Sequence, residues 1–224
     1  MDDTVLIVVV IAAVVIGAIA LIVWLRSRGK HRVTAAVVQA TAMFNLKPVS
    51  ATHPDLDEVW IASRGLISGV PVTLLGGMSR GSRNPGLIGG AGAMAAAVEL
   101  PSVTVLASFS VPLPFQLTMQ RRPQLSVPTF STGDREFDKT IEVKTRSDKA
   151  VRALLHNSSL RNAILGSLKK SSAKGEITDT QVMIRVVGVR ETVASIQKAV
   201  DLVQLLTKHV SALKDVQPEN SPKR

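Results

Sequence analysis

The clearest hydrophobic pattern in the chain is an uninterrupted apolar run near its N-terminus. The run TVLIVVVIAAVVIGAIALIVWL extends from Thr4 to Leu25 without a charged side chain. At about 1.5 Å of rise per residue, a helix of this length crosses the roughly 30 Å hydrocarbon core of a bilayer. A lone segment in lipid satisfies its backbone only as a helix, and Trp24 is of the type that prefers the headgroup interface. The pattern predicts a transmembrane helix.

The flanks of this run favour an uncleaved anchor over a cleaved secretory signal. A signal has a basic start, a shorter apolar core and a small-residue cleavage site. This chain instead starts with Met-Asp-Asp, and the run leads directly into basic residues, which are Arg26, Arg28, Lys30 and Arg32. The positive-inside rule therefore predicts a single-pass protein of the cell membrane, with its N-terminus outside and its C-terminal domain in the cytoplasm. The same basic residues are predicted to contact anionic lipid headgroups.

Beyond the anchor, apolar alternation predicts several strands. A short helix is expected first, over residues 33–44, because Pro48 cannot continue it. The predicted strands cover residues 58–63 and 66–75, separated by Arg64-Gly65 and interrupted at Gly69, which predicts a pair with a bulge or turn; residues 103–111 and 115–120, paired across Pro-Leu-Pro; residues 137–144; and residues 181–187. These runs are short and β-branched, and they predict a mainly antiparallel sheet.

In the second half the hydrophobic period changes from two towards 3.6, which predicts helices. They are expected over residues 149–156, 160–169 and 191–213, with a polar loop over residues 170–175. The fold class is therefore α+β: an N-terminal transmembrane helix followed by one mainly antiparallel sheet domain with helices packed on it. The predicted boundaries are 1–32 for the anchor and its basic segment, 33–216 for the domain, and 217–224 for a disordered tail.

A glycine-rich segment separates the two predicted strand pairs. Residues 76–92 read GGMSRGSRNPGLIGGAG, and Arg80 and Arg83 give the first half a positive charge. Glycine and proline at this density predict a flexible loop inserted in the domain. A second interpretation is a loop that dips into the nearby membrane, with Arg80 and Arg83 on anionic headgroups.

The charge of the chain narrows the class of partner. The 224 residues carry a formal net charge of +10, which favours anionic lipid or an acidic protein as a partner. Nucleic acid is disfavoured because aromatic residues make up 3% of the chain and tyrosine is absent, whereas single-strand binders stack bases on rings. The chain has no cysteine, which fits the cytoplasm but does not require it.

One motif suggests an enzyme. Gly77-Met78-Ser79-Arg80-Gly81 matches the G-x-S-x-G nucleophile elbow, and it follows an apolar strand as an elbow does. The downstream candidates for the base are His156 and His209. The Pro85-Gly86 pair soon afterwards opposes the helix that an elbow requires. The alternative function is therefore a membrane-tethered serine hydrolase that uses Ser79.

A second candidate site is acidic. Asp134, Glu136 and Asp138 alternate, so on a strand they would share one face and could bind a divalent cation. The bland interpretation is a solvated turn that leads into a strand, with Phe137 as its buried residue. The chain offers no His or Cys cluster for zinc, and neither a metal nor a cofactor is predicted.

The segment that starts at Phe130, read as FSTGDREFDKTIEVKTRSDKAVRALL, resembles the G-D-x-x-F-D core of a bacterial domain family of unknown function. That family occurs in small single-span membrane-anchored proteins. The resemblance covers about the final half of the chain; it implies the anchored α+β architecture but no reaction or ligand. The sequence therefore predicts a non-enzymatic interaction or scaffold module at the membrane surface, with the bilayer and a protein of unknown identity as partners.

Overall fold

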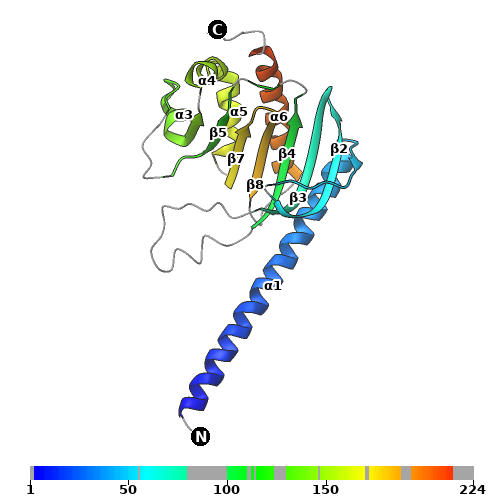
Figure 1. Cartoon of the computed structure of the whole chain (residues 1–224), viewed down its shortest axis with the longest axis vertical. Helices are drawn as coiled ribbons and strands as arrows, with labels where there is room; N and C mark the ends of the chain where they lie inside the picture. Colours follow the sequence, from blue (N-terminus) through cyan, green and yellow to red (C-terminus); the bar gives the residue numbers. More distant parts are fainter. Residues whose placement is uncertain are drawn as a thin grey trace, which may run out of the picture.

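The computed structural model describes residues 3–54, 56–79, 100–109, 112–113, 115–123, 130–145, 147–169, 172–187 and 193–213. One long helix projects from a domain in which further helices pack on a sheet (Figure 1). The fold is α+β, as the sequence predicts. The predicted tail and most of the glycine-rich segment, including Arg80 and Arg83, lie outside the described residues.

The first helix, α1, extends from Asp3 to Met43 without interruption. The expected separate helix over residues 33–44 is therefore the continuation of the apolar helix, because no proline separates the two. Asn45, two residues after the end of α1, terminates the helix because its φ of 52° is left-handed. The amide of Leu46 donates to the carbonyl of Thr41 at 2.9 Å. This arrangement is a Schellman cap, and it satisfies carbonyls that the end of a helix leaves free.

The sheet contains eight strands, all paired antiparallel among the described pairs, in the order β1-β2-β3-β4-β8-β7-β5-β6. The strands are β1 (Lys47–Pro48), β2 (Leu56–Ile67), β3 (Val70–Ser79), β4 (Leu100–Ser108), β5 (Leu117–Arg121), β6 (Ile141–Thr145), β7 (Ser172–Ile177) and β8 (Gln181–Val187). The last, β8, has the predicted bounds.

Two strand predictions near the start of the sheet are wrong in detail. The turn between β2 and β3 lies at Ser68-Gly69 and not at Arg64-Gly65, because Ser68 and Gly69 have φ values of 52° and 79°. Two successive residues with positive φ match the twist of a tight hairpin. The runs predicted as a second pair, β4 and β5, do not pair: β4 lies between β3 and β8, and β5 between β6 and β7.

Two further segments differ from their predicted structure. The polar stretch predicted as a loop over residues 170–175 contributes to β7, because β5 and β8 on either side satisfy its backbone. The run predicted as a strand over residues 137–144 starts as helix α3 (Arg135–Thr140) and becomes β6 only at Ile141. Local hydrophobic pattern does not report such pairing across the chain.

The G-D-x-x-F-D segment has a structural explanation. The Asp134 carboxylate caps α3 by accepting from the amides of Glu136 and Phe137, both at 3.1 Å. The Asp138 carboxylate accepts hydrogen bonds from the preceding loop, from Ser131 Oγ, from the amide and hydroxyl of Thr132, and from the amide of Gly133, at 2.7–3.2 Å. The alternating carboxylates therefore do not share the face of a strand, and Phe137 is fully buried, as predicted.

The remaining helices are α4 (Asp148–Leu155), α5 (Ser158–Leu168) and α6 (Val193–Leu213). They pack with the end of α1 on one face of the sheet, while the other face carries a smaller cluster around Leu75, Leu106 and Met183. Side chains of α1 that face the sheet, Val33 and Val37, are fully buried. The last turns of α1 are thus part of the main core.

Asp138 should contribute strongly to the stability of the domain. Burial raises the pKa of its carboxyl group, but the hydrogen bonds from Ser131, Thr132 and Gly133 outweigh this, and the pKa lies below its ordinary value. We expect Asp138→Asn to lower the free energy of unfolding by about 1–3 kcal/mol, because an amide cannot accept all of these bonds. Thermal or urea unfolding of the detergent-solubilised chain measures it.

The lowered pKa of Asp138 determines how its contribution to stability changes with pH. A depressed pKa stabilises the fold above the unfolded-state pKa, and this contribution is lost as the pH falls through the folded-state pKa. The difference between wild type and Asp138→Asn should therefore shrink below about pH 4. Glu136→Gln, the same chemical change at an exposed carboxylate that accepts a 2.7 Å hydrogen bond from Lys169, is the matched control and should have a smaller effect. Equal effects of both substitutions would contradict this explanation.

Candidate functional site

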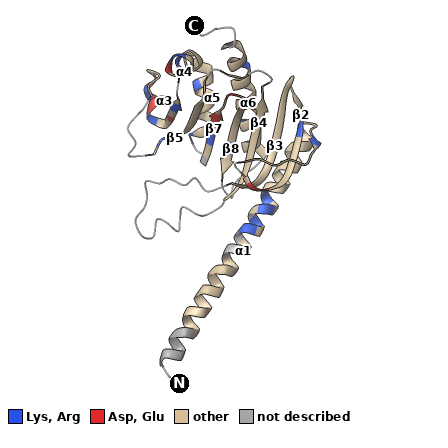
Figure 2. Cartoon of the chain, in the orientation of Figure 1, with Lys and Arg blue, Asp and Glu red and all other residues tan. Residues whose placement is uncertain are grey.

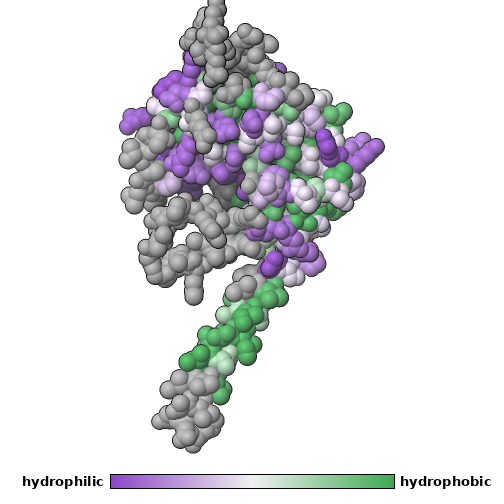
Figure 3. All heavy atoms as spheres, in the orientation of Figure 1, coloured by the Kyte–Doolittle hydropathy of each residue, from purple (hydrophilic) through white to green (hydrophobic). Residues whose placement is uncertain are grey.

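Within the described residues, one helix is long and apolar enough to cross a membrane, and it covers Val9–Met43. Its apolar half projects from the domain, and the apolar side chains described there are exposed (Figure 3). Trp24 among them is 53% exposed. The basic residues of the same helix lie where it enters the domain (Figure 2). We call the part of the molecule where α1 enters the domain, formed by Arg26, Gly29, Lys30, Glu58, Trp60 and Pro101, the neck.

Charge and aromatic contacts join α1 to the sheet at the neck. Glu58 of β2 forms ion pairs with Arg26, with an N–O distance of 3.4 Å, and with Lys30, at 4.0 Å. The ammonium of Lys30 also lies 5.6 Å from the centre of the Trp60 ring. Two of the four cations of the basic segment therefore have a carboxylate of the domain beside them. On the apolar side, Arg28 lies over Trp24.

Close packing reinforces these contacts. Gly29 is buried against Pro101 at the start of β4, and a Cβ at position 29 would collide with the proline ring. Val33 and Val37, one and two turns further along α1, pack closely against Gly76 of β3. A side chain at position 76 would collide there as well. The neck has no signal in the sequence, because neither an isolated glycine nor Glu58 indicates which distant element it contacts.

Ser79 does not have the surroundings of a nucleophile. It lies at the end of β3, it is 4% exposed, and its hydroxyl donates to the carbonyl of Leu100 at 3.0 Å. The first glycine of its motif, Gly77, has another role: a Cβ there would collide with the carbonyl of Glu58, where β2 bulges towards β3. The motif match thus reflects strand packing.

The structure does not bring the predicted histidines to Ser79. His209 is near the end of α6, beside a groove that also includes Val70, the first residue of β3. β3 separates Val70 from Ser79 by about 30 Å at roughly 3.3 Å per residue. His156 is exposed after α4, at the end of the domain far from the apolar half of α1 (Figure 1). Neither imidazole is within hydrogen-bonding reach of Ser79, which such a mechanism requires.

The carboxylates of the acidic candidate site also interact with hydrogen-bond donors of the protein itself. Asp134 forms a 3.0 Å ion pair with Arg161, whose guanidinium also donates to the carbonyls of Leu155 and His156. Hydrogen bonds from the Phe137 amide, then from Arg161, lower the pKa of Asp134. Among the described residues, no group of three or more His, Cys, Asp or Glu could hold a metal ion.

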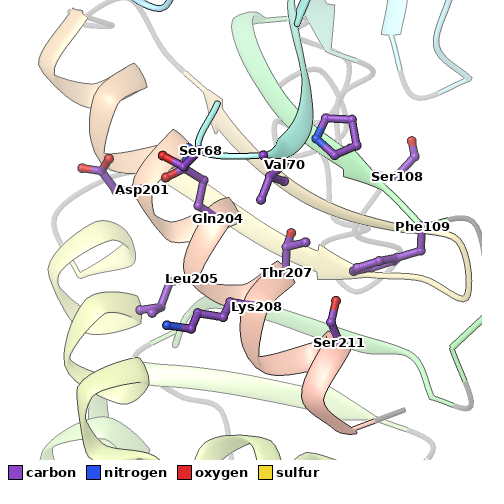
Figure 4. Close-up of a pocket in the computed structure, with 12 residues that line it drawn as sticks. Ser68, Val70, Ser108, Phe109, Asp201, Gln204, Leu205, Thr207, Lys208 and Ser211 are labelled. Carbon is purple, nitrogen blue, oxygen red and sulfur yellow. The ribbon is translucent and has the colours of Figure 1, made fainter. Parts of the chain in front are cut away.

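A groove lies at the end of the domain opposite the neck. It has a volume of about 870 Å³ between the β2–β3 turn, the end of β4 and α6. Figure 4 shows Phe109 and Val70 on one side, with Asp201, Lys208 and the hydroxyls of Thr207 and Ser211 along α6. Gln204 fixes the turn to the helix by donating to the carbonyl of Ile67 at 3.2 Å. The groove therefore combines apolar walls with polar side chains that include one cation and one carboxylate.

No protein-family model matches the sequence, and a comparison with curated proteins finds no match. The fold is similar to that in the crystal structure of the mycobacterial trehalose monomycolate transport factor A, TtfA. The TM-score is 0.51 at 10% sequence identity, over 88% of this chain and 99% of that chain. At this identity the similarity concerns the fold alone.

The packing of the neck predicts that a glycine-to-alanine substitution has different effects on stability at two positions of α1. Gly29→Ala gains helix propensity but places a Cβ against Pro101, so we expect unfolding to become easier by about 1–3 kcal/mol. Gly17→Ala is the matched control, because a Cβ at position 17 meets no atom within 4 Å. Thermal unfolding of both variants in detergent measures the difference. A Gly29→Ala variant as stable as Gly17→Ala would show that the neck is not tightly packed.

Proposed function

We propose that this protein is a single-pass membrane protein whose domain is a non-enzymatic interaction module on the cytoplasmic surface. The observation that carries the proposal is the continuity of α1, whose apolar half projects from the domain while its end is buried in the core. The same residues thus attach the domain and complete its fold. Such a construction suits a protein whose task depends on being at the membrane.

The chemistry of the described residues supports a binding role over a hydrolytic one. The Ser79 hydroxyl is buried and already donates to a backbone carbonyl, and the candidate bases are far along the domain. The groove opposite the neck is a more suitable contact surface, because in the proposed orientation it faces the cytoplasm, where a protein partner can reach it. The protein of similar fold is described as a transport factor, and that description is compatible with the proposal.

Anionic lipid is the second proposed partner. Arg26, Arg28, Lys30 and Arg32 follow the apolar run directly, so in a membrane they lie near the headgroups of the cytoplasmic leaflet. Because Glu58 is beside Arg26 and Lys30 and neutralises part of their charge, we expect Arg28 to contribute more to lipid attraction than either of them.

The orientation is testable because the chain contains no cysteine. Leu66→Cys introduces one thiol at a side chain that is 71% exposed, at the far end of the sheet. We expect a membrane-impermeant maleimide to label it only after the cells are permeabilised. Asp2→Cys, at the predicted outer end, is the matched control and should be labelled in intact cells. The reverse pattern would place the domain outside and contradict the proposal.

The hydrolase alternative has its own test. We expect a fluorophosphonate probe to leave the purified chain unlabelled, because the Ser79 hydroxyl has no adjacent base and is buried. The control is Ser79→Ala, which should give the same background. Labelling that disappears in Ser79→Ala would replace the interaction module by an enzyme.

A further inference from the structure

The distance along α1 between the apolar run and the first packed contact with the domain is very short. The run ends at Leu25, and Gly29 is already buried against Pro101. Four residues of helix rise only about 6 Å. The ion pair between Arg26 and Glu58 is closer still, one residue beyond the run.

The layer of lipid headgroups is about as thick as this distance. A bilayer of about 40–45 Å with a hydrocarbon core of about 30 Å leaves roughly 5–8 Å for the polar layer on each side. With the apolar run in the hydrocarbon, Gly29 and the start of β4 fall within that layer. An average helix tilt of about 20° shortens the rise along the normal only slightly.

The junction has no flexible joint that would let the domain move away. Helix α1 is unbroken from Asp3 to Met43, and residues on both sides of position 30 are fixed to the sheet, by Glu58 and Pro101 before it and by the burial of Val33 and Val37 after it. At this end of the sheet Glu58 and Pro101 contact α1, and Leu100, which precedes Pro101, is 38% exposed. We call these three residues the neck edge.

We propose that the neck edge lies in the headgroup layer of the phospholipid leaflet, held at that depth by the stiffness of α1 and not by attraction between charges. The inference rests on the proposed membrane anchorage and adds a contact between the folded domain and lipid. Charge is the weaker contributor, because Glu58 brings a carboxylate among phosphates and neutralises part of the adjacent cations. The contact is therefore expected in neutral lipid and at high salt.

The experiment measures depth at two points of the same sheet. The full chain carries one introduced cysteine with an environment-sensitive fluorophore, either Leu100→Cys or the matched control Leu66→Cys, and is reconstituted in phosphatidylcholine vesicles. A fraction of the lipid carries a nitroxide on its headgroup. Leu66 pairs with Pro71, about 25 Å along β3 from Ser79, the partner of Leu100. We expect at least twofold quenching at position 100 and almost none at position 66, unchanged at 0.5 M salt.

A second variant tests the stiffness of α1. Insertion of Gly-Ser-Gly-Ser between Leu25 and Arg26 creates a flexible joint while leaving the neck and the core unchanged. We expect it to reduce the quenching at position 100 in neutral vesicles. Unchanged quenching after the insertion would show that stiffness does not set the depth.

The outcomes separate this inference from the proposed function. A chain that does not float with the vesicles contradicts the membrane anchorage itself. A chain that floats but shows equal, weak quenching at positions 100 and 66 retains the anchorage and overturns the headgroup contact. Quenching at position 100 that requires anionic lipid and disappears with salt also overturns the proposal, because charge would then hold the domain.

Discussion

The packing of the last turns of α1 against β3 and β4 is the interaction on which the rest of the structure depends. Val33 and Val37 lie over Gly76, and Gly29 lies over Pro101. At each of these points a glycine lets a helix approach a strand, or a strand approach a helix, more closely than any other residue would allow. Without these contacts the part of the sheet face that α1 covers, over β2, β3 and β4, would lose that cover, and the apolar half of α1 would no longer be fixed to the domain.

The two halves of α1 therefore have different surfaces. Its first half has the uniform apolar surface that suits lipid, whereas its second half buries one apolar face against the sheet and exposes Val38 and Met43 on the other side. The change occurs within the basic segment. Two of its residues, Arg26 and Lys30, interact with the domain through Glu58. The basic segment is therefore a structural junction as well as the segment that we propose to lie near headgroups.

Local signals in the sequence predicted the elements better than their partners. The apolar run, the long helix α6 and the strand β8 are visible because their patterns are long or clean. The pairing of β4 with β8, the strand character of β7 and the helix that precedes β6 all depend on neighbours far along the chain. The helical start at Asp134 had a local signal, a capping aspartate, but the alternation of the following residues favoured a strand. The neck had none, since a buried glycine such as Gly29 is recognised only when its contact is known.

The order of the strands has a consequence for the synthesis of the protein. The central strand β8 and the helix α6 come from the last part of the chain, yet they connect the two halves of the sheet and cover the face on which α1 packs. The side of the α1 end that packs on α6 therefore stays uncovered until nearly the whole chain has left the ribosome, although β2, β3 and β4 follow α1 early in the chain. If α1 is the proposed membrane anchor, it holds the unfinished chain at the bilayer during this interval. A domain with such long-range contacts folds slowly and is prone to aggregate when exposed. With α1 anchored in a membrane, as proposed, the chain folds at a fixed position, which limits its contact with other incomplete chains.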